Sequence, residues 1–178
     1  MTGLRGRLLD VLLGPAERRL GVRLDYAREI GATRLGLLRR YGRIFPFLDP
    51  NRHVPADAYA AARLRAALAT DCGTCVAAEI ALARRAGLSG TTIDAILTGT
   101  GPTPELDAVV RLTDAVVLRR EDDADARADI VAAYGKAGLI ELSFAMNGAA
   151  LLPGIKRAMG FATACDLSTM RRLSDAGS

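Results

Sequence analysis

The sequence predicts an all-α protein, and its composition and residue spacing together carry this prediction. Half of the 178 residues are hydrophobic, whereas only 4% are aromatic. The apolar residues are mainly Ala, Leu, Val and Ile, and they recur with the three- and four-residue spacing of helices rather than the alternation of strands. No internal repeat stands out. A chain of this length and composition is sufficient for one close-packed helical domain with an added arm or tail.

The first part of the chain, residues 1–44, is expected to form a helical arm. An amphipathic helix is predicted over residues 3–13, because apolar side chains recur on one of its sides. Pro15 is expected to break this helix and to begin a second one, which runs to about Ile30. A third helix is predicted over residues 33–43.

Positive charge is concentrated near the N-terminus. The net charge is +4, and residues 1–54 carry eleven Arg against five Asp and Glu. Neither a recognition motif nor interleaved aromatic residues accompany this charge, so we expect no nucleic-acid partner. No stretch approaches the ~20 apolar residues that span a bilayer, and the apolar run at residues 8–13 is too short for an export signal and is interrupted by Asp10. We therefore expect no membrane partner and a cytoplasmic location.

The main domain is predicted to cover residues 45–165. It begins with a loop, because three prolines lie within residues 45–55, a stretch that also holds the only histidine, His53. An Ala-rich helix follows over residues 55–70, and its small side chains allow neighbouring helices to approach closely. Further helices are predicted over residues 71–86, 90–98, 103–119, 121–134 and 139–152, the last ended by Pro153, followed by a short helix to about residue 160 and a loosely held tail, 166–178.

Cys72 and Cys75 form a Cys-x-x-Cys motif at the start of one predicted helix. The spacing places both sulfurs within reach of a single disulfide. The first-turn amides of a helix lack backbone partners, and their positive end stabilises a thiolate and lowers the pKa of the thiol. Asp71 is expected to cap the helix, while Gly73 and Thr74 are small enough for a substrate to approach. The motif predicts a redox-active dithiol, in which one cysteine attacks and the other resolves.

Glu79 follows Cys75 by four residues and is therefore expected on the same helix face. An ionised Glu79 beside the sulfur would raise the pKa of the thiol, whereas a protonated Glu79 would act as a general acid or base. We take Cys75, Cys72 and Glu79 as the candidate catalytic residues.

Cysteines spaced in this way also occur in metal sites, in thioredoxin-like sites and as inert buried residues. A zinc site needs two further ligands, and only Cys165 and His53 remain at a distance in the sequence, so we expect no metal and no cofactor. A thioredoxin-like site requires a βαβ setting, which is absent. Two buried and inert cysteines remain an alternative, because free Cys is among the most buried residue types. Cys165 is expected to pack as a small hydrophobic residue.

The order of these features resembles the alkyl hydroperoxidase D-like / carboxymuconolactone decarboxylase family. An Ala-rich helix is followed by Cys-x-x-Cys opening a second helix, a Gly-Leu-Ser turn, and a short helix that ends at Leu97-Thr98-Gly99. The matching core is residues 55–99, and the arm lies outside it. The resemblance implies an all-helical bundle, a homo-oligomer and, in the redox branch of the family, thiol-dependent reduction of a small-molecule hydroperoxide.

In that branch, the resemblance makes Cys75 the cysteine that attacks the peroxide and becomes a sulfenic acid. Cys72 would be the resolving cysteine, and a dithiol reductant would reopen the disulfide. The chain departs from the pattern at both stations of the family's proton relay: it has Glu79 where the branch has His, and Ala60 near the place of a usual Glu. His53 is a candidate to fold back and assist.

Two other functions fit the same fold. A lyase or decarboxylase acting on a small organic acid would use Arg63 and Arg65 to pair a substrate carboxylate, although a solvated helix face is the simpler interpretation of these residues. A non-enzymatic oligomeric binding protein would carry vestigial cysteines, and the departures from the relay favour it.

Overall fold

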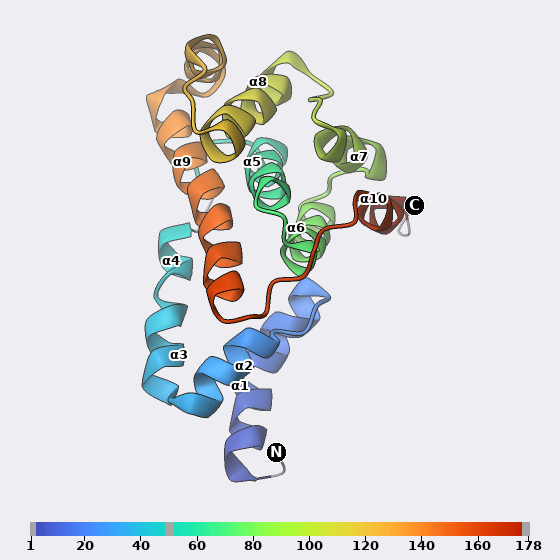
Figure 1. The fold of residues 1–178 in the computed structure, drawn as a ribbon. Coiled ribbons are helices and arrows are strands. Elements are labelled where there is room, and N and C mark those ends of the chain that lie inside the picture. The colour runs from blue at the N-terminus through green and yellow to red at the C-terminus, as the bar shows by residue number, and fades with distance from the viewer. Residues whose placement is uncertain (1–2, 49–51, 176–178) are drawn as a thin grey trace.

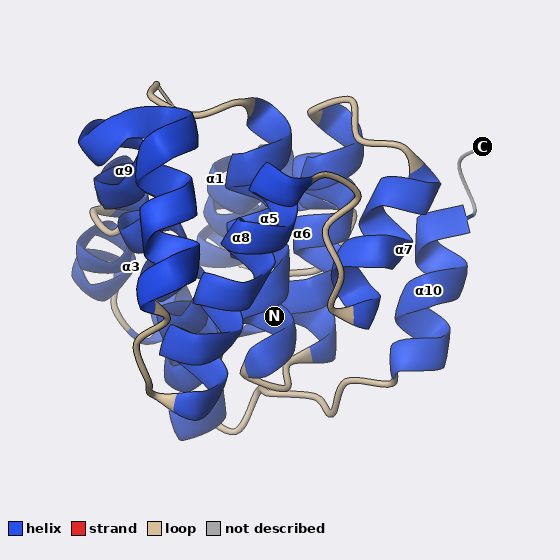
Figure 2. Ribbon diagram, turned by 90° about the horizontal axis from the view of Figure 1, so that it is seen from above, coloured by secondary structure: helices blue, strands red, loops and turns tan. Residues whose placement is uncertain are grey.

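The computed structural model describes residues 3–48 and 52–175, which form helices joined by loops, with no strand among them (Figures 1 and 2). This confirms the all-α prediction. In chain order the helices are α1 (Leu4–Leu20), α2 (Asp25–Thr33), α3 (Leu35–Gly42), α4 (Phe45–Leu48), α5 (Ala56–Ala69), α6 (Gly73–Arg85), α7 (Gly90–Thr98), α8 (Pro104–Thr113), the π-helix η1 (Asp114–Arg119), α9 (Ala124–Ala158) and α10 (Leu167–Asp175).

Helix α5 lies at the centre of the molecule and contacts α6, α7, α8 and α9 (Figure 1). Its alanines permit this, because short side chains let neighbouring backbones approach. Five of them are at most 1% exposed: Ala58, Ala61, Ala62, Ala66 and Ala67. Larger side chains of the surrounding helices, such as Ile93, Val109 and Leu142, fill the remaining space in the main core.

A second, smaller core lies between the arm and the end of α9. Tyr26 of α2 and Tyr41 of α3 are buried in it, with a hydrogen bond of 2.6 Å between their hydroxyls and an edge-to-face contact of the rings. Leu152 and Ile155 of α9 pack against this pair. Since α1 also contacts α6, the arm covers the main domain beside the dithiol helix (Figure 1).

Helix α9 has 35 residues and consists of two segments joined at Gly135, where φ is 72°. Glycine adopts this left-handed conformation without a steric penalty. Among the described residues, α9 alone is long and apolar enough to cross a membrane, and 39% of its most apolar stretch is buried inside the protein. Leu142 and Met146, at most 1% exposed, belong to the main core.

At three places where the sequence predicts that a helix is interrupted, the structure contains helix. Helix α1 continues through Pro15, and α9 continues through Pro153. Proline removes one helical hydrogen bond, and at Pro15 the carbonyl that loses its donor belongs to the exposed Val11, where water can replace it. The predicted loop contains the short helix α4, while residues 49–51 of that loop lie outside the described residues.

The expected loosely held tail is a helix over most of its length. Helix α10 packs against α7 and α6, and Met170 is buried at its centre. Arg171 donates two hydrogen bonds to Asp94 of α7, at 2.5 and 3.0 Å. The last described part of the chain is therefore docked on the main domain through Met170 and Arg171.

Candidate functional site

The dithiol lies at the first turn of α6. The helix begins at Gly73, and Cys72 is the residue that precedes it, with its carbonyl accepting from the amides of Cys75 and Val76 at 2.9 and 3.0 Å. The expected cap, Asp71, does not serve as one. Its backbone is in the left-handed region, with φ of 49°, and its Oδ1 accepts from the Cys165 amide at 2.8 Å.

The segment between α9 and α10, residues 160–166, crosses the first turn of α6. The Gly73 amide donates to the Thr163 carbonyl at 3.0 Å, and the hydroxyls of Thr74 and Thr163 are 3.0 Å apart. A Cβ at Gly73 would lie 2.8 Å from the Ala164 carbonyl oxygen, so only glycine fits there. Gly73 is thus buried beneath this segment, and the expectation that a substrate approaches over it is wrong.

The two thiols form a close pair. Their Sγ atoms are 2.8 Å apart and share a hydrogen bond. Cys72 is fully buried, whereas Cys75 is half-buried and lines a cavity. A small molecule in that cavity can therefore reach Cys75 but not Cys72.

Lys156 of α9 provides a cation beside this pair. Its Nζ lies 3.6 Å from the Cys75 sulfur, although the side chain is only 4% exposed. The ammonium also lies 5.2 Å from the centre of the Tyr26 ring, a favourable cation–π distance. Sequence reasoning missed Lys156, because it lies 81 residues from Cys75 and no local pattern links them.

The hydrogen bond between the two sulfurs and their surroundings lower the pKa of one thiol and raise the pKa of the other. The pKa of Cys72 is lowered to about 5, chiefly by its hydrogen bond with Cys75 and further by Lys156, against the opposing effect of burial. The pKa of Cys75 is raised, because the remaining proton is held between the sulfurs and the thiol is largely buried. At neutral pH the pair therefore holds one negative charge and one proton.

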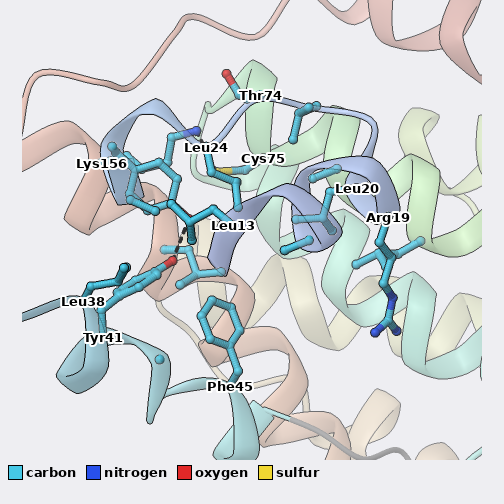
Figure 3. A pocket seen from close by; sticks show the side chains of 18 of the residues that line it. Leu13, Arg19, Leu20, Leu24, Leu38, Tyr41, Phe45, Thr74, Cys75 and Lys156 are labelled. Atoms are coloured by element: carbon cyan, nitrogen blue, oxygen red, sulfur yellow. Dashed lines mark hydrogen bonds between the residues drawn. The ribbon is translucent and has the colours of Figure 1, made fainter. Parts of the chain in front are cut away.

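The cavity has a volume of about 720 Å³ and lies between the arm and α6, with the end of α9 at one side. Figure 3 shows Lys156 and Cys75 together at one side of it and Arg19 at the other. Apolar side chains form most of its wall, notably Leu13, Leu38 and Phe45. The arm, which sequence reasoning treated as separate, is thus one wall of the site.

Glu79 also lines the cavity, but both of its carboxylate oxygens are held by Arg63 of α5. The two hydrogen bonds are 2.9 and 2.7 Å long, and both side chains are about 10% exposed. Arg63 also lies over the Tyr59 ring at 5.8 Å. The structure therefore places Cys75 and Glu79 on one wall of the cavity, with Cys72 buried beside Cys75 and Glu79 engaged in a buried ion pair.

Arg65 makes a similar pair with Asp114 of η1, through hydrogen bonds of 2.6 and 2.8 Å. The interpretation of Arg63 and Arg65 as a solvated helix face is wrong. Arginines spaced two apart on a central helix point to different neighbours, and the charge of each is balanced by a carboxylate that sequence proximity does not reveal.

His53 and Cys165 lie apart from the reacting face of the pair. His53 is exposed, and its amide donates to Glu141 of α9 at 2.6 Å. Glu141 and Lys156 are fifteen residues apart on one helix, about 22 Å along its axis, so His53 is far from Cys75. Cys165 packs against the main core as a small residue. Nowhere in the described residues do three Cys, His, Asp or Glu side chains gather as a metal site.

Comparisons of the chain with models of known protein families, with curated proteins and with solved structures found no match. The geometry of the dithiol and its cavity is therefore what indicates a function.

Proposed function

We propose that this protein is a dithiol-dependent peroxidase that reduces hydroperoxides with Cys75 and Cys72. The observation that carries the proposal is the arrangement of one cavity-facing sulfur, Cys75, 2.8 Å from a buried second sulfur and 3.6 Å from the Lys156 ammonium. A half-buried sulfur beside a cation, in a pair that carries one negative charge, is better suited to nucleophilic chemistry than to inert packing. The same arrangement suits the redox branch of the family that the sequence resembles.

The reaction balances with the residues present and an external dithiol. The proton that the two sulfurs share first passes to Cys72, which leaves Cys75 as the thiolate. Cys75 then attacks one peroxide oxygen, the O–O bond breaks, and the leaving oxygen takes a proton to become an alcohol. Cys75 is then a sulfenic acid. The Cys72 sulfur attacks it and water leaves, which forms a disulfide between the two cysteines. A dithiol reductant of the cytoplasm returns the pair to the thiol state through exchange.

Lys156 is the group best placed to handle the proton. Its ammonium stabilises the thiolate and lies beside the sulfur where the leaving oxygen forms. Glu79 was the expected proton carrier, but Arg63 holds both of its oxygens. We therefore assign Glu79 a positioning role, in which its ion pair fixes α6 against α5 beneath Cys75.

We further propose that the chain forms a homo-oligomer through α9. Ile140, Phe144 and Leu151 are 54%, 44% and 49% exposed and lie on one face of this helix. Large apolar side chains gathered on one face are typical of a subunit contact. Light scattering coupled to size-exclusion chromatography would give a mass near that of the 18.8 kDa monomer if this proposal is wrong.

The peroxidase proposal is tested by titrating the fully reduced protein with a small organic hydroperoxide. One equivalent should consume two thiols per chain and lower the intact mass by two hydrogens. Peptide mapping should place the new disulfide between Cys72 and Cys75. Unchanged thiol content after excess hydroperoxide would exclude the proposal.

A further inference from the structure

The charges on the wall of the cavity are strongly unbalanced. Among the described residues that line it, five are charged, and Glu79 is the single acid. Arg63 holds both oxygens of that acid, so these two charges cancel. Three cations remain, Arg19 of α1, Arg39 of α3 and Lys156. A cavity with this excess of positive charge attracts an anion.

The cations occupy two different surroundings. Lys156 is buried beside the dithiol, where it already faces the negative charge that the sulfurs share. Arg19 and Arg39 lie on exposed positions of the arm. In Figure 3, Arg19 is separated from Lys156 and Cys75 by the breadth of the pocket. A ligand anion is therefore favoured at the two arginines and repelled at the thiolate.

Neither rim arginine has an ion-pair partner within the described part of the chain, in contrast to their neighbours in the arm. Arg28, for example, is held by Glu17 and Asp10. The guanidinium groups of Arg19 and Arg39 thus remain available to a carboxylate, which they can bind through two parallel hydrogen bonds while its oxygens stay hydrated.

The wall between the two charged sides is apolar. It includes Leu12, Leu13, Leu20, Leu24, Leu38 and Leu82. The volume of about 720 Å³ falls within the ~300–1,000 Å³ of typical ligand pockets. A ligand that packs against this wall needs an apolar body. A ligand that also binds an exposed arginine needs an anionic group at one end.

We propose that the cavity binds long-chain carboxylic acids, with the carboxylate at Arg19, across the cavity from Lys156, and the hydrocarbon chain extending inward towards Cys75. This inference rests on the proposed function only in naming the substrate: the peroxide to be reduced is one carried on the chain of such an acid. Binding of the unmodified acid requires no redox chemistry.

The test is binding of dodecanoate and of dodecanol to the reduced, full-length protein, by displacement of a fluorescent fatty acid below the micellar concentration. We expect the acid to bind at least about tenfold more tightly than the alcohol, because charged hydrogen bonds add to the same apolar burial. Shortening the acid by one methylene should weaken binding about fourfold.

A matched pair of variants locates the head group. The variant R19Q should lose the preference for the acid and bind acid and alcohol alike. The control R18Q removes the same charge from the adjacent exposed arginine, which does not line the cavity, and it should keep the preference.

Equal binding of acid and alcohol to the natural protein, or equal loss of preference in both variants, would overturn the inference. Absence of binding by either ligand would do so as well. Oxidation of the natural protein by tert-butyl hydroperoxide, which is neutral and short, reports on the proposed function separately. A protein that reacts with it but does not bind dodecanoate keeps the peroxidase function and loses this substrate class.

Discussion

Lys156 supplies the positive charge that stabilises a thiolate in the dithiol. It is buried, its ammonium contacts both an aromatic ring and the Cys75 sulfur, and it lies where a negative charge must be stabilised. An opposite charge at this distance typically lowers the pKa of an acid by about 1–3 units. The helix start alone would give a smaller effect.

Replacing Lys156 with Met should therefore raise the pKa at which the pair loses its first proton. In the natural protein this proton leaves near the value of about 5 that Cys72 shows, and the two sulfurs share the negative charge that remains. The rate of alkylation of Cys75 should therefore rise through about pH 5 and then change little to about pH 8. In K156M the rise should come about 1–3 units higher. Alkylation at about pH 6 should then be slower by about twofold for a shift of one unit and by about ninetyfold for a shift of three.

The matched control is Lys136→Met, which removes the other lysine of α9 from an exposed position. Its pH profile should coincide with that of the natural protein. Coincident profiles for K156M and the natural protein would show that Lys156 does not stabilise the thiolate.

Local signals in the sequence identified Cys72, Cys75 and the face on which Glu79 lies, because spacing on one helix determines these positions. Lys156 and Arg63 could not be found in this way. Each reaches the site from another helix, and the side chains that share a cavity wall are set by how helices pack. The carboxylate partners of Arg63 and Arg65 were hidden for the same reason.

Among the elements, the segment over residues 160–166 constrains the dithiol most closely. It places a carbonyl oxygen against Gly73 and hydroxyl and amide groups against the first turn of α6. The first turn of α6 is thereby held in one conformation, which keeps the two sulfurs in contact and Cys72 out of solvent.

Gly73→Ala should disturb this contact. The added methyl group would meet the Ala164 carbonyl at 2.8 Å, so the segment must move. We expect a loss of about 1–3 kcal/mol in the free energy of unfolding, as for other overpacked sites, measured by denaturant titration of the reduced protein.

Gly154→Ala is the comparison variant, because a methyl group there meets open space in the interior of α9. It should stabilise the protein by up to about 1 kcal/mol. If both variants were equally stable, the close approach at Gly73 would not constrain the first turn of α6.

Helix boundaries could be predicted from the sequence where local side-chain contacts set them. The prediction failed where packing between helices sets them. Thr103 accepts a hydrogen bond from the Leu106 amide, and Pro104 follows it, as its sequence indicated. Pro15 and Pro153 were expected to end helices and do not. A proline costs one hydrogen bond, and packing of the flanking turns can outweigh that cost.

At the scale of the whole molecule, the protein has two cores with the cavity beside their junction. The main core contains α5 to α9, and the smaller one joins the arm to the end of α9. The arm can therefore loosen while the main core stays folded. The all-α class followed from composition, but the arm's position against α6 did not, because nothing in its pattern specifies which helix it covers.

Tyr41→Ala should loosen the arm selectively. Tyr41 is 9% exposed and contacts both Tyr26 and Phe45. Loss of a buried aromatic side chain costs about 3–5 kcal/mol. We expect hydrogen exchange in α1–α3 to accelerate while exchange in α5 is unchanged.

Leu37→Ala, at a 44% exposed position of the same helix, should leave both regions as they are. Equal acceleration in α3 and α5 of the Tyr41 variant would mean that the two cores unfold as one.

The central claim is that Cys75 is the peroxide-attacking thiol, and trapping its sulfenic acid tests this most directly. The variant Cys72→Ser, treated with one equivalent of hydroperoxide and a 1,3-dione reagent, lacks the resolving sulfur and should accumulate the label. Peptide mapping should find the label on Cys75. Label on Cys165, or no label in a folded and fully reduced variant, would contradict it.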